Sequence, residues 1–496
     1  MMPKSKTFYY LTAFIGGMTI MAIEMSAVRV ISPYFGSSIF VWTNILGIIM
    51  IALATGYFFG GRVADKAPHP KVFFTIVLFG AIAVMTLPFV AQPLLENLSE
   101  FMHLSTTSLI LCSLAANMLL FFIPFALLGM ISPYLIRLST HKVEKTGNVS
   151  GTIFAISTLG SITGTFLPTL LTVPLFGVKR TIILFGAILC VIAAIGMAKK
   201  SLYIAVALFA FLTVLSSPYM INHGQIIAQT ESPYSYVAIR EDSEHTRYLS
   251  FNQTAAVQSM QKPDSIFTGG HYWDYMALLP NVACADKCDV AIIGSAGSTI
   301  ARQIDFVYPN AVIDGVEIDP KVTELASQYF DYDLDSLTMH HADGRIFLAK
   351  QSKNYDLIIL DAFDDIEMPP HLTSWEFAKI VKTRLAPNGV FAVNIISTTD
   401  TNDPYLRYLS TLGRHFTQIS EINLPQFSNR IILATNRDGD LIKSIKNSQL
   451  PVAELEQVFA YWQNNIVDRS DIDAQLITDD MPLTEILADQ MIFEGR

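Results

Sequence analysis

The sequence predicts a multi-span α-helical membrane domain, followed by a small β-strand unit and a doubly wound α/β domain. Only 15% of the 496 residues are charged and 51% are hydrophobic, whereas soluble domains are about 25% charged. Residues 1–221 carry 13 Lys and Arg against 5 Asp and Glu, a net charge of +8. The remainder carries 20 against 38, a net charge of −18. This split, with a change of hydrophobic period after Ile221, predicts domains in different solvents.

Residues 1–221 contain seven apolar runs of about the 20 residues that a membrane-spanning helix needs. Lys and Arg gather mostly in alternate connections, which places the N-terminus in the cytoplasm. The first run lacks a small-residue cleavage site, so we expect a retained span rather than a signal peptide. Seven crossings would put the C-terminal domain outside the cytoplasm, but the sequence leaves its side open. The runs lie at about 8–31, 39–61, 72–94, 107–136, 150–176, 180–198 and 201–221.

An internal repeat is suggested inside this region. VISPYFG (30–36) resembles MISPYLI (130–136), and SSIFVWTNILG (37–47) resembles SGTIFAISTLG (150–160). Three spans per unit would make the two units inverted, as in many transporters. The alternative is chance similarity between apolar segments.

Charged and small residues in the spans could serve either helix packing or a function. Glu24 lies within the first span, where a charge is costly and is either functional or turned towards other helices. The pairs Gly56-x-x-x-Gly60 and Gly160-x-x-x-Gly164 predict close helix packing rather than binding.

The remaining composition excludes some classes of site. Cys284 and Cys288 lie in CADKC, which lacks the CxxC spacing of zinc sites and has no partner pair, so no metal site is predicted. The acidic C-terminal half disfavours nucleic acid as a partner and is compatible with cationic substrates.

The C-terminal half divides into residues 222–285 and 286–496. Residues 231–259 read as short strands with polar turns, which predicts a small β-unit. From Asp289 onward strand and helix patterns alternate, which predicts a doubly wound, mostly parallel sheet of Rossmann-like type. The expected strands are 289–294, 311–319, 337–343, 355–361 and 389–396, and the expected helices are 298–308, 320–330, 374–385 and 403–416.

Four features fall at the carboxyl ends of these strands, where such sheets bind ligands. The first is the small-residue turn GSAGST (294–299), with Gly294, Ser295 and Gly297, which lets a ligand approach the backbone. The second is Glu317, about 20 residues past the turn, where an acid accepts hydrogen bonds from ribose hydroxyls. The others are acids after the next strands: Asp343, then Asp361 with Asp364 and Asp365.

Each acid, taken alone, could have a purely structural role instead of binding a ligand. Asp343 and Asp361 would then serve as helix caps, and Glu317 would be a solvated loop residue. Acids at three consecutive strand ends beside a small-residue turn instead favour one adenosyl-binding site.

With these motifs in place, residues 231–436 resemble the spermidine synthase (polyamine aminopropyltransferase) family. The resemblance lies in ESPYSY (231–236), Gln258, HYWDYMALLP (271–280), GVEIDPKVTELASQYF (315–330), HADGRIFL (341–348) and YDLIILDAFDD (355–365). The membrane half, with SPYFGSSIFVW and GYFFGGRVADK, resembles bacterial forms in which several spans precede such a domain. This likeness implies a methyltransferase-type sheet and a multi-pass protein of the bacterial inner membrane.

The resemblance also implies roles for single residues. Glu317 would bind the ribose, and Asp343 with Gly344 the adenine side. Asp361 would be the catalytic acid. Facing the polyamine would be Gln258, Tyr272, Asp274, Asp364 and Asp365.

The implied reaction moves an aminopropyl group from decarboxylated S-adenosylmethionine, as co-substrate, to putrescine or a related polyamine. No tightly bound cofactor and no metal are implied, and the partners would be the donor, the amine and membrane lipid, with a homodimer left open. One departure matters, because the family usually has an Asp that grips the donor amine where this chain has Gly297. A methyltransferase or another adenosyl-dependent transferase therefore remains an alternative, as does a polyamine or cation transporter with a sensor domain.

Overall fold

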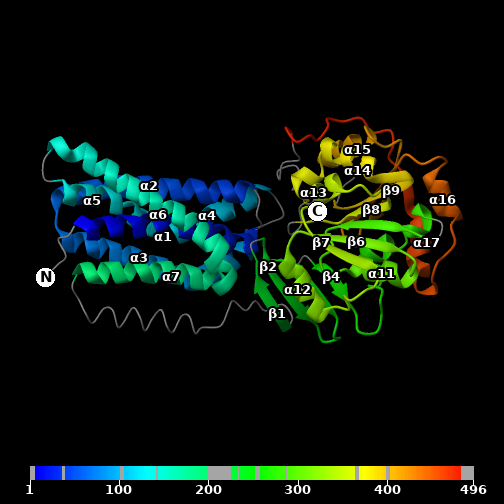
Figure 1. Ribbon diagram of the computed structural model, residues 1–496, viewed down its shortest axis with the longest axis horizontal. Helices are drawn as coiled ribbons and strands as arrows, with labels where there is room; N and C mark the ends of the chain where they lie inside the picture. Colours follow the sequence, from blue (N-terminus) through cyan, green and yellow to red (C-terminus); the bar gives the residue numbers. More distant parts are fainter. Residues whose placement is uncertain are drawn as a thin grey trace. The chain divides into compact units, whose positions relative to one another are not determined.

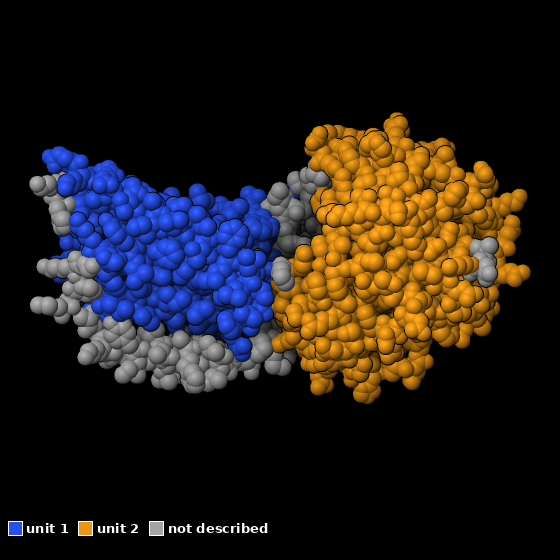
Figure 2. Space-filling view, in the orientation of Figure 1, with its two compact units in different colours: residues 1–103, 107–221 blue, residues 104–106, 222–496 orange. Residues whose placement is uncertain are grey.

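The computed structural model describes residues 6–35, 39–100, 106–140, 143–197, 225–232, 234–251, 257–284, 287–363, 368–397, 401 and 403–481. The chain forms two compact units (Figure 2). The first comprises residues 1–103 and 107–221, and the second comprises residues 104–106 and 222–496. Each unit has hydrophobic clusters of its own.

Helices make up nearly all of the described residues of the first unit (Figure 1). Five segments are long and apolar enough to cross a membrane: Lys6–Ser32, Phe40–Lys66, Pro70–Leu98, Ile110–Ser139 and Val143–Met197. The helices are α1 (Lys6–Phe35), α2 (Ile39–Lys66), α3 (Pro70–Glu100), α4 (Thr106–Gly129), α5 (Ile131–Ser139), the 3-10 turn η1 (Val143–Lys145), α6 (Thr146–Leu167), the π-turn η2 (Pro168–Thr172) and α7 (Val173–Met197).

The last of these segments has 55 residues, which as one helix would be about 80 Å long, far more than the ~30 Å of a hydrocarbon core. Gly177 interrupts it with non-helical dihedral angles (φ 80°, ψ 167°). A positive φ of this kind suits glycine, which has no Cβ. The two resulting stretches correspond to the predicted runs 150–176 and 180–198. The predicted run 201–221 lies outside the described residues.

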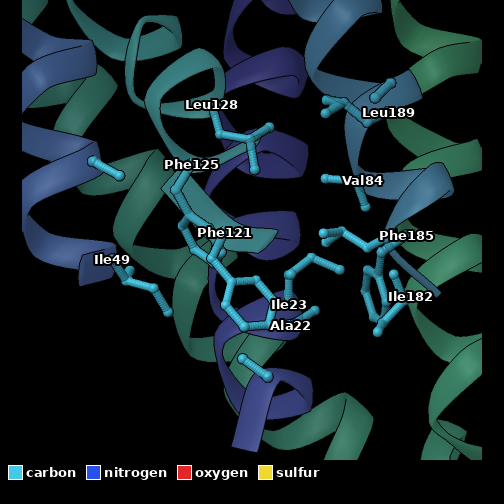
Figure 3. Packing of buried hydrophobic residues seen from close by; sticks show 14 of the residues in the cluster. Ala22, Ile23, Ile49, Val84, Phe121, Phe125, Leu128, Ile182, Phe185 and Leu189 are labelled. Atoms are coloured by element: carbon cyan, nitrogen blue, oxygen red, sulfur yellow. The ribbon is translucent and has the colours of Figure 1, made fainter. Parts of the chain in front are cut away.

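Glycines bring the backbones of neighbouring helices into contact. A Cβ added to Gly160 or Gly164 of α6 would lie 2.0 Å from the carbonyl oxygen of Phe14 or 2.1 Å from that of Met18 on α1. Only glycine allows this approach, as the predicted small-residue pairs require. Elsewhere large side chains fill the unit, and Figure 3 shows Phe121 of α4 beside Ala22 and Ile23 of α1.

The helix pairing is relevant to the suggested repeat. Helix α1 packs against α6, α2 against α4 and α5, and α3 against α7. Helix α1 also packs against α7. The suggested internal repeat stays a prediction.

The second unit starts with an antiparallel sheet of four strands in the order β1-β2-β3-β4. Residues of β2 and β3 pack against α12 (Pro320–Tyr329), forming a cluster with Val322 and Ala326. The small sheet therefore covers one part of the larger fold. Its strands are β1 (Gln225–Glu231), β2 (Tyr236–Glu241), β3 (Arg247–Phe251) and β4 (Val257–Gln261).

A sheet of eight strands in the order β12-β10-β11-β9-β8-β5-β6-β7 forms the centre of the second unit (Figure 1). Strands β9, β8, β5, β6 and β7 are parallel, whereas β10, β11 and β12 run antiparallel to their neighbours. This confirms the predicted doubly wound α/β class. The strands are β5 (Asp289–Ile293), β6 (Val312–Glu317), β7 (Leu337–His341), β8 (Tyr355–Leu360), β9 (Leu385–Ile396), β10 (Gln418–Leu424), β11 (Asn429–Thr435) and β12 (Ile466–Asp468).

Helices follow the parallel strands because each apolar helix face needs an apolar sheet face to cover it. After β5 the chain continues to β6 and β7 on one side of the sheet and then returns to β8 and β9 on the other. Ligands bind at such a reversal of direction, beyond the carboxyl ends of the strands. The remaining elements are α9 (Tyr272–Met276), α10 (Pro280–Ala283), α11 (Thr299–Val307), α12, α13 (Gly344–Lys350), η3 (Pro370–Leu372), α14 (Trp375–Arg384), α15 (Asp403–Gly413), α16 (Leu441–Asn447), η4 (Ala453–Leu455) and α17 (Glu456–Asn465).

Candidate active site

A cavity of about 240 Å³ lies where the sequence places its site motifs. The ends of β5, β6, β7 and β8 form its base, and residues of the small sheet and of η3 complete its wall. Of the predicted site residues, six line this one cavity: Gln258, Gly294, Glu317, Asp343, Gly344 and Asp361.

The turn after β5 has an unusual backbone. Gly294 has φ +87°, and a Cβ there would lie 2.4 Å from the carbonyl oxygen of Asp361, which directly follows the neighbouring strand β8. Ala296 (φ 43°) and Ser298 (φ 60°) are also left-handed, which costs energy for residues other than glycine. This conformation directs the Ala296 N–H to Glu317 Oε2 at 3.0 Å, so the turn and the second strand end are tied together.

Ser295 and Gly297 belong to the turn but do not line the cavity. The Ser295 hydroxyl lies 3.2 Å from the Ser298 hydroxyl. The Gly297 N–H donates to Ser259 Oγ at 2.8 Å, and a Cβ on Gly297 would lie 2.8 Å from the Ser259 Cβ. Ser259 thus occupies the space that a longer side chain at position 297 would need.

Glu317 is held in place by backbone donors. Its carboxylate accepts from the N–H groups of Ala296 and Asp319, both at 3.0 Å. Burial raises the pKa of Glu317 to about 7, although these hydrogen bonds act in the opposite direction. Each oxygen keeps a lone pair that a ligand hydroxyl could use.

Asp361 is a further carboxyl group of the cavity wall and follows β8. The Tyr272 hydroxyl donates to its Oδ2 at 3.0 Å, and the Asn394 amide donates to its Oδ1 at 2.8 Å. Asn429 in turn donates to the oxygen of Asn394 at 2.9 Å, which fixes the orientation of that amide. Burial raises the pKa of Asp361 to about 7, against the effect of its two donors. Burial and the charge of Asp361 hold the pKa of Tyr272 far above its usual value, so Tyr272 stays a hydrogen-bond donor.

Asp343 has a structural contact as well as a place in the cavity. Its Oδ1 accepts from the Ile346 N–H at 2.9 Å and caps α13, and its Oδ2 lies 2.7 Å from His371 Nε2. Next to it, a Cβ on Gly344 would lie 2.2 Å from Ile293, so glycine is required there for contact with β5.

Asp274 was expected to face the polyamine, and the structure corrects this. Its Oδ1 accepts from the backbone and hydroxyl of Thr268 and from Gln303, and its Oδ2 accepts from the Gly270 N–H at 2.6 Å. It is 1% exposed and does not line the cavity. Asp274 therefore braces the loop before α9. Asp364 and Asp365 lie outside the described residues.

Three residues of the site were absent from the sequence-based list. Asn394 supports Asp361, His371 contacts Asp343, and Asp319 lines the cavity beside Glu317. Only Asn394 gave a signal, as a polar residue inside an apolar strand.

The charge of the cavity wall is one-sided. Four carboxylates face it, from Glu317, Asp319, Asp343 and Asp361. The described lining residues include His371 but no Lys or Arg. Such a wall favours a cationic ligand over an anionic one.

Cys284 and Cys288 are joined as a disulfide, with Cα atoms 5.5 Å apart. Their sulfur atoms and an oxygen of Asp356 form the one group of potential metal ligands found among the described residues. Asp356 already accepts from the Asp289 N–H at 3.0 Å, so it anchors the start of β5.

Comparison with known proteins gives the following matches. Residues 271–440 match the spermine/spermidine synthase domain. A polyamine aminopropyltransferase from Vibrio vulnificus is 30% identical over 259 residues, which is 49% of this chain and 81% of that protein. A probable polyamine aminopropyl transferase from Bifidobacterium longum is 40% identical over 171 residues, 34% of this chain but only 37% of that protein. An eEF1A lysine and N-terminal methyltransferase from Xenopus laevis is 31% identical over 32% of this chain and 24% of its own length.

Proposed function

Because this chain belongs to the spermidine synthase (polyamine aminopropyltransferase) family of transferases, we propose that it transfers an aminopropyl group from decarboxylated S-adenosylmethionine to putrescine or a related polyamine. The products would be a spermidine-like polyamine and methylthioadenosine. The adenosyl donor is a co-substrate here, and the proposal includes no tightly bound cofactor.

The acidic cavity is the observation that carries this proposal. The donor brings a sulfonium and an ammonium group, and the acceptor brings further ammonium groups. Four carboxylates face the cavity, and its described wall has no Lys or Arg. Coulomb attraction in a partly buried site favours ligands of this charge.

Asp361 is the group we assign to the reaction itself. Aliphatic amines have pKa values near 10 and arrive protonated. The carboxylate of Asp361 would hold the ammonium group and take one proton from it. The freed nitrogen lone pair then attacks the carbon beside the sulfonium. The C–N bond forms as the C–S bond breaks, its electron pair goes to sulfur, and neutral methylthioadenosine leaves.

Tyr272 and Asn394 would hold Asp361 in position during this step. Each donates to a different oxygen of the carboxylate, which leaves further lone pairs for the amine. Positioning of this kind supplies much of an enzyme's rate. We propose that Gln258, Asp364 and Asp365 also face the acceptor, and that Asp343 and Gly344 lie at the adenine side.

The same cavity bears on the methyltransferase alternative. S-Adenosylmethionine carries a carboxylate that its decarboxylated form lacks. That carboxylate would meet Glu317, Asp319, Asp343 or Asp361 with no Lys or Arg among the described lining residues. Repulsion between like charges therefore favours the decarboxylated donor.

A direct test uses the purified full-length chain with putrescine and each donor in turn, with products identified by mass spectrometry. We expect a mass gain of one aminopropyl group on the amine, with the decarboxylated donor only. A methylated amine formed from S-adenosylmethionine would show that the alternative is correct.

For the first unit we propose a multi-pass anchor in the bacterial inner membrane. The support is the five apolar helical segments and the Lys and Arg residues in alternate connections. Extraction of the protein from membranes by detergent, but not by alkaline carbonate, would be the expected behaviour. Release by carbonate would contradict it.

A further inference from the structure

A further inference concerns the C-terminal segment, residues 469–481, which follows β12 and contains neither helix nor strand. It is held against α14 and α15. The backbone N–H of Trp375 donates to the Ile477 carbonyl oxygen at 2.8 Å, and the Ile477 N–H donates to Thr411 Oγ1 at 2.9 Å. The Ile477 side chain is buried. The segment thus leads from β12, at one edge of the large sheet, to α13, which follows the opposite edge strand β7.

Asp479 of this segment forms an ion pair with Arg345, in the first turn of α13. Its Oδ1 accepts from Arg345 Nη1 at 2.7 Å, and its Oδ2 accepts from Arg345 Nη2 at 2.6 Å. The hydrogen bonds from Arg345 lower the pKa of Asp479 to about 2, so the pair stays ionised at the pH of an enzyme assay. Exposed ion pairs usually contribute little to stability, but a bidentate pair fixes the orientation of the guanidinium.

The oriented guanidinium holds a part of the cavity wall. Arg345 Nη1 also donates to the carbonyl oxygen of His371 at 3.1 Å. His371 lies in η3 and lines the cavity, and its Nε2 lies 2.7 Å from Asp343 Oδ2. Asp343 caps the helix that carries Arg345, so both the backbone and the side chain of His371 are fixed to the start of α13.

This part of the wall differs in origin from the base of the cavity. Sheet hydrogen bonds hold the ends of β5, β6, β7 and β8, whereas η3 is a turn of three residues in the connection between β8 and α14. A 3-10 turn has few hydrogen bonds of its own, so its position depends on neighbouring elements. Neither Arg345 nor Asp479 lines the cavity, and both would therefore act on it only through η3.

We propose that Asp479 is a positioning residue of the cavity: by orienting Arg345, it holds η3 in place and keeps His371 against Asp343. The C-terminal segment is thereby part of the support of the ligand site, although it lies outside the cavity wall. The effect on ligand binding rests on the proposed function, whereas the effect on the position of His371 does not.

The first test needs no ligand. Diethyl pyrocarbonate acylates the ring nitrogen of neutral histidine, and mass spectrometry of peptides from the full-length protein gives the rate at each site. In Asp479→Asn the side chain keeps its size but loses its charge, so His371 should leave Asp343 and react roughly fivefold faster. The reaction of His245, whose side chain is 77% exposed, is the internal reference and should not change.

The matched control is Asp473→Asn. Asp473 belongs to the same segment and pairs with Arg414 at 2.8 Å, outside the cavity wall. This variant should leave the rate at His371 unchanged, and Asp479→Glu, which retains a carboxylate, should restore most of the protection. An unchanged rate at His371 in Asp479→Asn, or an equal rise in Asp473→Asn, would overturn the inference.

The second test measures calorimetric binding of methylthioadenosine and the kinetics of transfer. For Asp479→Asn we expect roughly fivefold weaker binding and a higher KM for the donor. The value of kcat should be retained, because Tyr272 and Asn394 still hold Asp361.

A double substitution shows whether Asp479 acts through His371. In a His371→Ala background, Asp479→Asn should cause no further loss of binding, because its connection to the cavity is already removed. A further loss in that background would show a general structural effect and contradict the proposal. If the unsubstituted protein fails to bind methylthioadenosine, the proposed function fails, while the modification rates of His371 still decide the inference.

Discussion

Two sets of glycines, one in each unit, have different tasks, and the difference shows what a small residue can mean in a sequence. In the helical unit, Gly160 and Gly164 keep ordinary helical backbone and are needed because another helix passes at van der Waals distance. In the second unit, Gly294 is needed for its positive φ and for the approach of a neighbouring strand. The Gly-x-x-x-Gly pair allows two helices to pack closely, whereas the glycine after β5 shapes the turn beside the cavity.

The units also place acidic side chains differently. In the second unit four carboxylates converge on one cavity, two of them from β6 and its turn. The described residues of the helical unit include only Glu24, Asp65, Glu96, Glu100 and Glu144 as acids. Substitutions in one unit at a time would therefore test whether the helical unit contributes to stability and the second unit to the reaction.

The largest effect is expected from Asp361→Asn. The amide cannot accept a proton from the amine, so transfer should fall on the order of 10³-fold. Binding of methylthioadenosine should persist, because Asn keeps the size of the side chain. Steady-state transfer and calorimetric binding would be measured on the same protein. Asp473→Asn, at a side chain 89% exposed, is the control, and turnover near the normal rate in Asp361→Asn would refute the assignment.

A packing effect of about 1–3 kcal/mol is expected in the other unit from Gly160→Ala. The added methyl group would meet the Phe14 carbonyl oxygen at 2.0 Å and push α1 away from α6. Thermal unfolding in detergent should shift downward, while nucleoside binding by the second unit should persist at moderate temperature.

The matched control for that change is Gly151→Ala in the same helix, where a Cβ meets nothing within 4 Å. At this position only the higher helix propensity of Ala matters, and it should stabilise the unit slightly. Equal shifts for the two variants would contradict the account of close helix packing.

A smaller effect, on pH dependence, is expected from Asn394→Ala. Transfer requires ionised Asp361, so its rate should rise with pH through about 7, the raised pKa of that group. The hydrogen bond from Asn394 lowers this pKa, and its removal should move the rising limb to higher pH. The limb of kcat/KM against pH is the measurement, with Asn465→Ala on the exposed surface as control. A purely structural role would lower the rate without moving the limb.

Much of the fold could be predicted because its signals are local. Apolar strands and amphipathic helices alternate from Asp289 onward, and each parallel strand predicted there is present. The acids at the strand ends converge because parallel strands end at one edge of the sheet. The convergence of Glu317, Asp343 and Asp361 could therefore be predicted without knowledge of long-range contacts.

The misplaced and missing residues depend on geometry that spacing does not reveal. Tyr272 and Asp274 are two positions apart in the short helix α9, and side chains at that spacing point to different sides. Tyr272 reaches Asp361, so Asp274 turns away towards Gln303. The contact of His371 with Asp343 depends on the path of the loop before α14, for which the sequence has no periodic signal.

The raised pKa values of Glu317 and Asp361 have a consequence for ligand entry. Both lie at about 7, so near neutrality each carboxyl group is protonated for a large fraction of the time. A cation that enters the cavity stabilises the ionised forms and expels protons into solution. Binding of a charged donor should thus exchange a bound proton for a cation. The measured heat of binding should therefore vary with the ionisation enthalpy of the buffer. Binding of uncharged methylthioadenosine should release few protons.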